Sequence, residues 1–249
     1  NLLTMCLQPD EGAHLRFEVK VPGQGMTMRS EDMEFHYEDA FPDHAIADAY
    51  EEAGASLARV DSVPASSVAA AVEEAIGSLG GIDVLSSAAD AFLAKPIEQV
   101  EPGDLGEVLM ANFAANFTAA QCAEGHMAAQ ETGGNIVLVT HVLGERGLPN
   151  TTVYSAAHGA LQNFIRALAQ EVAARSISVN GIALGWMDWM TDRLDEEDPQ
   201  ALRAIRFTMS KRAGTKEDIG PMAVWLAGSG VGFVTGQIFP LDGGLTQHL

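Results

Sequence analysis

Tyr154, His158 and His141 are the three side chains whose types and spacing could carry out acid–base chemistry. Tyr154 and His158 are four residues apart, a spacing that places two side chains on one face of a helix. A protonated imidazole stabilises a neighbouring phenolate, so His158 could tune the acidity of Tyr154 wherever the imidazole is charged. His141 could donate a hydrogen bond to a substrate oxygen or act as a base. These residues predict a site that moves protons to and from a small-molecule substrate.

The elements that must position these residues alternate between strand and helix from about residue 56 onward. The continuous apolar run Ile136–Val139 is typical of a strand buried on both faces of its sheet. Helices are expected at 45–53, 66–76, 105–129, 154–175 and 217–226, and strands at 56–60, 82–85, 136–139, 178–183 and 233–241. Strands that alternate with helices form parallel βαβ units, so the fold class is α/β with a doubly wound parallel sheet.

The N-terminal part of the chain has a different pattern. Residues 15–21 and 33–37 alternate between apolar and polar side chains, and residues 22–25 contain turn-forming Pro and Gly. We therefore expect a short β-rich N-terminal extension at residues 1–32, followed by a second unit at residues 33–249. The sequence does not begin with Met, and its first seven residues are too short for a secretory signal and lack its basic flank.

The charge balance restricts the partners of this protein. The chain has 34 acidic and 14 basic residues, for a net charge of −20, and 47% of its residues are hydrophobic. A strongly acidic protein does not suit nucleic acid or an anionic membrane surface, so neither is expected as a partner. The two cysteines, Cys6 and Cys122, form no CxxC motif or Cys/His cluster, so no metal site is predicted and a reducing, cytoplasmic location is expected.

The second half of the chain resembles the short-chain dehydrogenase/reductase superfamily over roughly residues 43–249. The motifs that carry the resemblance are Gly134-Asn135-Ile136-Val137, Gly144, Tyr154-Ser155-Ala156-Ala157-His158, Ser178-Val179-Asn180-Gly181-Ile182-Ala183, Arg212-Ala213-Gly214-Thr215, Phe233-Val234-Thr235-Gly236-Gln237-Ile238 and Asp242-Gly243-Gly244. The resemblance implies a single Rossmann-type domain that assembles as a homotetramer through its two long helices.

The resemblance also implies a catalytic set, which this chain keeps only in part. In the superfamily a Tyr acts as acid and base, a Lys four residues later lowers its pKa, a Ser polarises the substrate carbonyl, and a helical Asn orders a relay water. Tyr154 and Asn112 match the Tyr and the Asn, whereas His158 occupies the Lys position and His141 the Ser position.

The dinucleotide site that the superfamily implies is poorly matched. Counted back from the helix at Ala45, its glycine-rich phosphate loop falls at residues 36–43, where Tyr37, Phe41 and Asp43 replace the three glycines. Three carboxylates there would repel a diphosphate. We therefore expect no cofactor-binding residues and no NAD or NADP, and an apolar substrate pocket walled instead by Phe41, Trp186 and Trp189.

Two further resemblances bear on function. Residues 8–51 resemble a segment from the C-terminal domain of glucose-6-phosphate dehydrogenase, without its catalytic motifs. The pattern His141-x12-Tyr154-x3-His158 partly resembles the Ser, Tyr and Arg of halohydrin dehalogenases, which have abandoned the dinucleotide. The leading hypothesis is a cofactor-independent, dehalogenase-like or lyase-like enzyme for a hydroxylated, epoxide or carbonyl compound. The alternatives are an NAD(P)-dependent oxidoreductase with atypical motifs and a catalytically inactive oligomeric relic.

Overall fold

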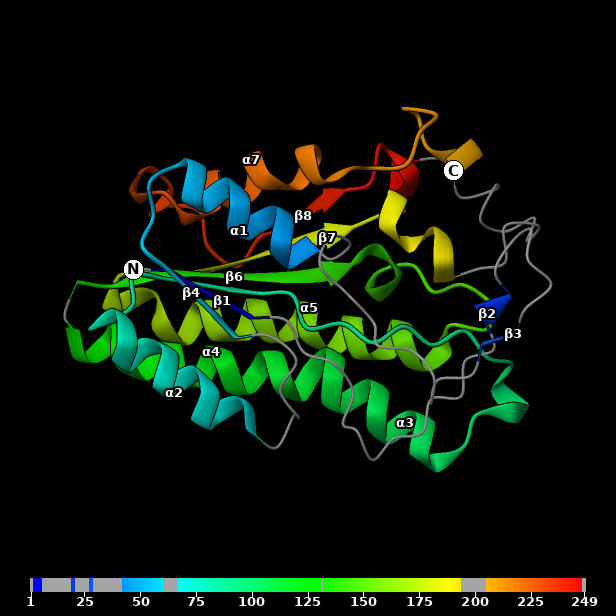
Figure 1. Ribbon diagram of the computed structural model, residues 1–249, viewed down its shortest axis with the longest axis horizontal. Helices are drawn as coiled ribbons and strands as arrows, with labels where there is room; N and C mark the ends of the chain where they lie inside the picture. Colours follow the sequence, from blue (N-terminus) through cyan, green and yellow to red (C-terminus); the bar gives the residue numbers. More distant parts are fainter. Residues whose placement is uncertain are drawn as a thin grey trace.

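Six parallel strands form the central sheet of the protein (Figure 1). The computed structural model describes residues 2–5, 19–20, 27–28, 42–60, 67–130, 132–193 and 205–247. The strand order across the sheet is β4-β1-β5-β6-β7-β8. The strands are β1 (Leu2–Met5), β4 (Leu57–Val60), β5 (Val84–Ser87), β6 (Gly134–His141), β7 (Ile177–Leu184) and β8 (Ile238–Leu241). The predicted α/β, Rossmann-type fold is confirmed.

Helices cover both faces of this sheet (Figure 1). On one face lie α1 (Pro42–Glu52) and α7 (Lys216–Ala227). On the other lie α2 (Val68–Leu79), α4 (Ala115–Gln130) and α5 (Thr152–Val172), with α3 (Pro102–Leu109) continuing into α4 through a π turn at Met110–Ala114. The predicted helix at 105–129 is therefore three consecutive segments.

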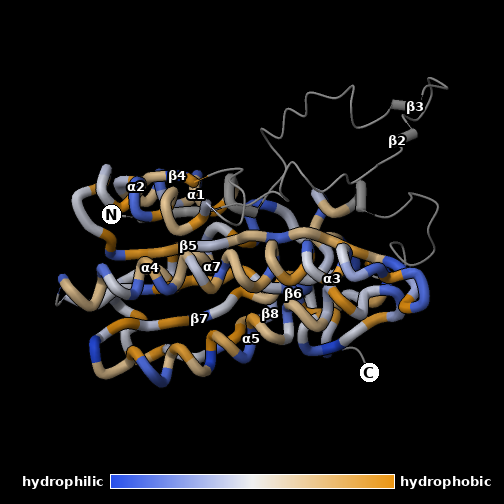
Figure 2. Tube along the Cα trace, turned by 90° about the horizontal axis from the view of Figure 1, so that it is seen from below, coloured by the Kyte–Doolittle hydropathy of each residue, from blue (hydrophilic) through white to orange (hydrophobic). Residues whose placement is uncertain are grey.

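Each face of the sheet has its own hydrophobic core. On the face of α2, α4 and α5, the fully buried Leu161 and Ile165 of α5 pack with Ile136 and Leu138 of β6. On the opposite face, residues of α1 and α7 pack against the other side of β6 and β7. Figure 2 shows hydrophobic residues along β5 and β7. Because β6 is covered on both faces, its segment Ile136–Val139 is apolar without alternation.

The packing of α1 against α7 includes a buried hydrogen bond. The Tyr50 hydroxyl donates to the Ala223 carbonyl oxygen at 3.1 Å. Burial raises the pKa of Tyr50 well above its ordinary value, so this side chain stays a neutral phenol. At the start of α7, Asp218 accepts hydrogen bonds from the Thr215 backbone N–H at 2.8 Å and from the Arg212 guanidinium at 2.6 and 2.8 Å. These contacts satisfy a helix terminus whose backbone donors have no partner within the helix.

The position of β1 corrects the predicted domain organisation. Leu2–Met5 pair in parallel with β4 on one side and with β5 on the other, as the second strand from the edge of the sheet. These four residues therefore belong to the Rossmann-type sheet, not to an extension at 1–32. A four-residue strand carries too little pattern to be recognised alone, and its pairing partners lie more than 50 residues away. Residues 19–20 (β2) and 27–28 (β3) form a separate two-stranded antiparallel sheet. Most of the predicted strands at 15–21 and 33–37 lies outside the described residues.

The position of β1 also relocates the first strand–helix connection. This connection runs from the end of β1 at Met5 to the start of α1 at Pro42. Such connections usually have two to six residues. From β1 the chain passes through α1 to β4 on one side of β1, and then through α2 to β5 on the other side. The crevice at such a switch point is where doubly wound sheets bind ligands. A phosphate loop that follows β1 would begin at Cys6, not at residue 36, and residues 36–41 lie outside the described part.

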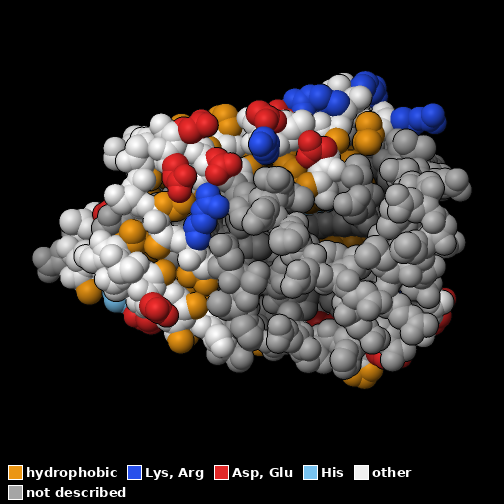
Figure 3. Space-filling view, viewed as in Figure 1, with side chains coloured by type: hydrophobic (Ala, Val, Ile, Leu, Met, Phe, Trp, Pro, Cys, Tyr) orange, Lys and Arg blue, Asp and Glu red, His pale blue; other side chains and the backbone are white. Residues whose placement is uncertain are grey.

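Acidic and basic side chains are interspersed on the described part of the surface in Figure 3. Among the described residues, no helix is both long and apolar enough to cross a membrane.

Candidate active site

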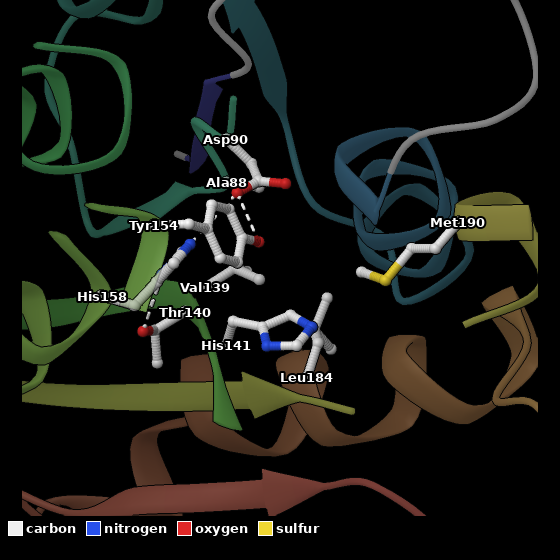
Figure 4. A pocket seen from close by; sticks show the side chains of 9 residues that line it. All are labelled: Ala88, Asp90, Val139, Thr140, His141, Tyr154, His158, Leu184 and Met190. Carbon is white, nitrogen blue, oxygen red and sulfur yellow. Dashed lines mark hydrogen bonds and ion pairs between the residues drawn. The ribbon is translucent and has the colours of Figure 1, made fainter. Parts of the chain in front are cut away.

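A small cavity lies at the carboxyl ends of β5, β6 and β7 (Figure 4). It measures about 10 Å³, which is roughly the room that one water molecule needs. Its described lining consists of Ala88, Asp90, Val139, Thr140, His141, Tyr154, His158, Leu184 and Met190. The cavity therefore brings together Tyr154, His158 and His141, the three residues singled out in the sequence, and adds an acidic residue, Asp90.

Tyr154 is held in the first turn of α5 with only 1% of its surface exposed. Its hydroxyl donates a hydrogen bond to Asp90 Oδ1 at 2.9 Å. The ring of Phe92 meets the Tyr154 ring edge-on, with 5.1 Å between the centroids. A hydrogen bond at one end and an aromatic contact along the ring fix the orientation of this phenol.

His158 lies one helical turn further along α5 and is also buried. Its Nε2 is 3.2 Å from Asp90 Oδ1, and its Nδ1 is 3.1 Å from Thr140 Oγ1. The rings of Tyr154 and His158 are 4.4 Å apart between centroids, as the four-residue spacing predicts. Both ring nitrogens of His158 thus face oxygen atoms.

His141 ends β6 and borders the same cavity. Its Nδ1 accepts a hydrogen bond from the Leu143 backbone N–H at 3.1 Å, so the ring proton of the neutral imidazole is on Nε2. The His141 and Tyr154 ring centroids are 5.5 Å apart. Beside Tyr154, the His141 ring could offer a second hydrogen-bond donor to a substrate oxygen.

Asn112 holds a neighbouring segment of the chain and is absent from the described cavity lining. It is fully buried in the π turn between α3 and α4. Its Oδ1 accepts the Ala91 backbone N–H at 3.0 Å, and its Nδ2 donates to the carbonyl oxygens of Ala91 at 2.8 Å and Val108 at 2.9 Å. Asn112 therefore fixes the segment that carries Asp90. π turns recur at functional sites, but the helical pattern of this stretch did not predict one.

Asp90 is the residue of the cavity that sequence reasoning missed as an active group. It follows β5 closely in the chain, but 64 and 68 residues separate it from Tyr154 and His158. The available signal was its place after a buried strand, because the carboxyl ends of parallel strands converge on the ligand site of such a sheet.

Two glycines allow the turn after His141 to lie directly against α5. A Cβ atom on Gly144 would come within 2.7 Å of the His158 carbonyl carbon and 2.8 Å of the Gly159 nitrogen. On Gly159, a Cβ would approach the Gly144 carbonyl oxygen to 3.1 Å. The Gln162 amide also donates to the His141 carbonyl oxygen at 2.9 Å. This close approach sets the position of His141 relative to His158.

The three residues predicted to wall a substrate pocket do not appear in the described lining of the cavity. Phe41 lies outside the described residues. Trp186 and Trp189 follow β7 and pack against the core on the α1 and α7 face. Among the residues that the structure describes, the indole nitrogens of both tryptophans are buried without a hydrogen-bond partner. A buried donor without a partner is costly and marks a place where a ligand could supply an acceptor.

Comparison with known proteins identifies the family. Residues 27–246 match the family model described as "Enoyl-(Acyl carrier protein) reductase". The match extends over most of the chain, and the chain belongs to this family of the short-chain dehydrogenase/reductase superfamily.

Individual relatives carry reductase names. The chain is 30% identical over 159 residues to the 3-oxoacyl-[acyl-carrier-protein] reductase MabA of Mycobacterium tuberculosis, covering 64% of this chain and 62% of that protein. It is 38% identical over 113 residues to the 3-oxoacyl-[acyl-carrier-protein] reductase FabG of Pseudomonas aeruginosa, covering 45% of each chain. An alignment with Nodulation protein G of a Rhizobium species likewise covers 46% of that relative. The chain thus spans only about half to two thirds of the length of these relatives.

Solved structures match more of the chain. A blue fluorescent protein from a metagenomic library, in complex with NADPH, is 28% identical with a TM-score of 0.73, covering 82% of this chain and 93% of that one. The TT0495 protein of Thermus thermophilus is 25% identical with a TM-score of 0.78, covering 84% of this chain and 95% of that one.

These findings correct two predictions from the sequence. MabA and FabG are named reductases, and a structural neighbour contains NADPH, so the prediction of a cofactor-independent, dehalogenase-like or lyase-like enzyme is wrong. The prediction that NAD and NADP are absent is wrong for the same reason. It was drawn from residues 36–43, whereas the loop after β1 starts at Cys6. The resemblances to halohydrin dehalogenases and to glucose-6-phosphate dehydrogenase stay hypotheses.

Proposed function

We propose that this protein is an NAD(P)-dependent oxidoreductase that interconverts a ketone and an alcohol, with a 3-oxoacyl thioester as the substrate class. The observation that carries the proposal is the buried phenol of Tyr154 beside a cavity at the carboxyl end of a Rossmann-type sheet. The reductase names of MabA and FabG support the substrate class, and the NADPH in a structural neighbour supports the cofactor.

The described residues fit the nicotinamide end of such a cofactor. The switch point at β1, which lies between β4 and β5, provides the crevice in which doubly wound sheets bind dinucleotides. The indole N–H groups of Trp186 and Trp189, on the connection after β7, have no hydrogen-bond partner in the described part of the chain and could hold the carboxamide oxygen. The diphosphate end would lie beside residues 6–41, most of which are outside the described part.

The chemistry assigned to the chain is proton transfer. When bound, a reduced nicotinamide supplies the hydride that the substrate carbonyl carbon takes up. Tyr154 donates its hydroxyl proton to the carbonyl oxygen, and the Nε2–H of His141 could orient that oxygen. One hydride and one proton convert the ketone to an alcohol, with the dinucleotide oxidised by two electrons. In the opposite direction Tyr154 accepts the alcohol proton.

The test is consumption of NADPH or NADH by the purified protein with acetoacetyl-CoA as the ketone. We expect Tyr154→Phe to lose about 100-fold or more of the rate, the usual contribution of a general acid. Tyr50→Phe is the matched control, because the Tyr50 hydroxyl bonds to Ala223 between α1 and α7. Equal loss in both variants, or none in Tyr154→Phe, would refute the role of Tyr154.

The predicted homotetramer and the cytoplasmic location remain part of this proposal. Large apolar side chains are exposed on α3, the π turn, α4 and α7, namely Leu105, Met110, Phe117 and Trp225. Burying them between subunits would remove apolar surface from water. Light scattering should give about four times the monomer mass of 26.3 kDa, whereas the monomer mass itself would refute the assembly.

A further inference from the structure

We propose that Asp90 is a positioning residue that orients the Tyr154 hydroxyl and passes a proton from His158 to Tyr154 after each substrate protonation. The inference rests on the proposed function and assigns to Asp90 and His158 the task of restoring the general acid. Three contacts carry it, from Tyr154 to Asp90, from His158 to Asp90, and from His158 to Thr140 (Figure 4).

The first step of the argument is that one carboxylate oxygen serves two donors. Asp90 Oδ1 is 2.9 Å from the Tyr154 hydroxyl and 3.2 Å from His158 Nε2. Both distances are within hydrogen-bonding range. The oxygen that accepts the hydrogen bond of the phenol is therefore also within reach of the proton on the imidazole.

The second step is that the surroundings of His158 suit the charged and the neutral ring. An imidazolium has two N–H donors, and the two nitrogens of His158 face Asp90 Oδ1 and Thr140 Oγ1. A hydroxyl can both accept and donate, so Thr140 also satisfies the neutral ring, whichever nitrogen then bears the proton. The other titratable groups that line this cavity are Asp90, Tyr154 and His141. His158 can thus cycle between its two charge states in place.

The third step is the proton balance. When Tyr154 gives its proton to the substrate oxygen, a phenolate would remain beside the Asp90 carboxylate, and two adjacent buried anions are unfavourable. Transfer of the His158 Nε2 proton to Asp90, and of a proton from Asp90 to Tyr154, removes the second anion. The imidazolium becomes a neutral imidazole that keeps its proton on Nδ1, toward Thr140. A proton from water restores the imidazolium before the next turnover.

The kinetic experiment compares Asp90→Asn with the wild type, using NADPH or NADH and acetoacetyl-CoA. The Asn side chain can still accept a hydrogen bond but cannot carry the proton. We expect kcat to fall by about 10- to 100-fold with KM changed by less than about threefold, since relay groups act on the chemical step. Asp83→Asn is the matched control, because Asp83 is exposed at the opposite end of β5. An unchanged kcat in Asp90→Asn, or an equal loss in Asp83→Asn, would overturn the proposal.

A second measurement does not require activity. In proton–nitrogen spectra of the histidine rings, the Nε2–H of wild-type His158 should be protected from exchange with water by its hydrogen bond to Asp90. Asp90→Leu should lose that signal, while the remaining spectrum reports whether the variant is folded. If neither dinucleotide supports reduction, the proposed function fails while this signal still tests the network. Absence of the protected signal from the folded wild type would overturn the inference itself.

Discussion

Replacing Gly144 by Ala should disturb the site through packing alone. The added Cβ would meet the His158 carbonyl carbon at 2.7 Å and the Gly159 nitrogen at 2.8 Å. Carbon atoms in contact prefer about 3.5 to 4.0 Å, so the turn and α5 must separate by close to 1 Å. Overpacking of this kind costs about 1 to 3 kcal/mol.

The assay for Gly144→Ala combines thermal unfolding with reductase kinetics. In a domain of this size, each kcal/mol lowers Tm by about 2 to 4 °C. Reductase activity should fall as well, because the turn follows His141 and the contacted helix carries His158. Gly125→Ala is the control, since nothing lies within 4 Å of its Cβ position in α4, and it should stabilise the helix by about 0.8 to 1 kcal/mol. A Gly144→Ala protein with unchanged Tm and activity would refute the packing argument.

Three further substitutions test the core, a helix start and the π turn. Leu161→Ala removes a fully buried side chain and should lower the free energy of unfolding in urea by about 2 to 5 kcal/mol. A decrease of less than about 1 kcal/mol would contradict the assigned core. Arg212 lowers the pKa of Asp218 from 3.8 to about 2, so this carboxylate stabilises the fold above about pH 4 and loses that effect as the pH falls toward 2. Asp218→Asn should flatten the dependence of Tm on pH in that window, and an unchanged slope would count against the contact. Asn112→Ala should lower the free energy of unfolding by about 1 to 3 kcal/mol, because the Ala91 backbone loses its hydrogen bonds to this side chain. An unchanged free energy of unfolding in denaturant would contradict the role of Asn112.

Much of the fold could be predicted from residue patterns, because its long elements bury whole faces. The apolar run at 136–139 predicted β6, the segment 178–183 was also predicted as a strand and lies in β7, and the helix predicted from Tyr154 corresponds to α5. β1 could not be recognised, because Leu2–Met5 is only four residues long and is stabilised by pairing with distant strands. The π turn at Met110–Ala114 differs from an α-helix in its hydrogen bonding, which side-chain periodicity does not record.

The candidate site was predictable to the extent that it depends on local spacing. Tyr154 and His158 lie together because they are one turn apart on α5, and His141 joins them at the end of β6. Asp90 became evident only from the fold, since its contacts join segments more than 60 residues apart. The cofactor prediction failed because counting back from α1 placed the phosphate loop at residue 36, and only the position of β1 gives its start.

Calorimetric titration of the purified protein with NADPH and with NADH tests the central claim most directly. The account predicts saturable binding of at least one dinucleotide, with a dissociation constant in the range of about 1 μM to 1 mM that is usual for enzyme substrates. Failure of both to bind saturably to the folded protein would contradict its assignment as an NAD(P)-dependent oxidoreductase.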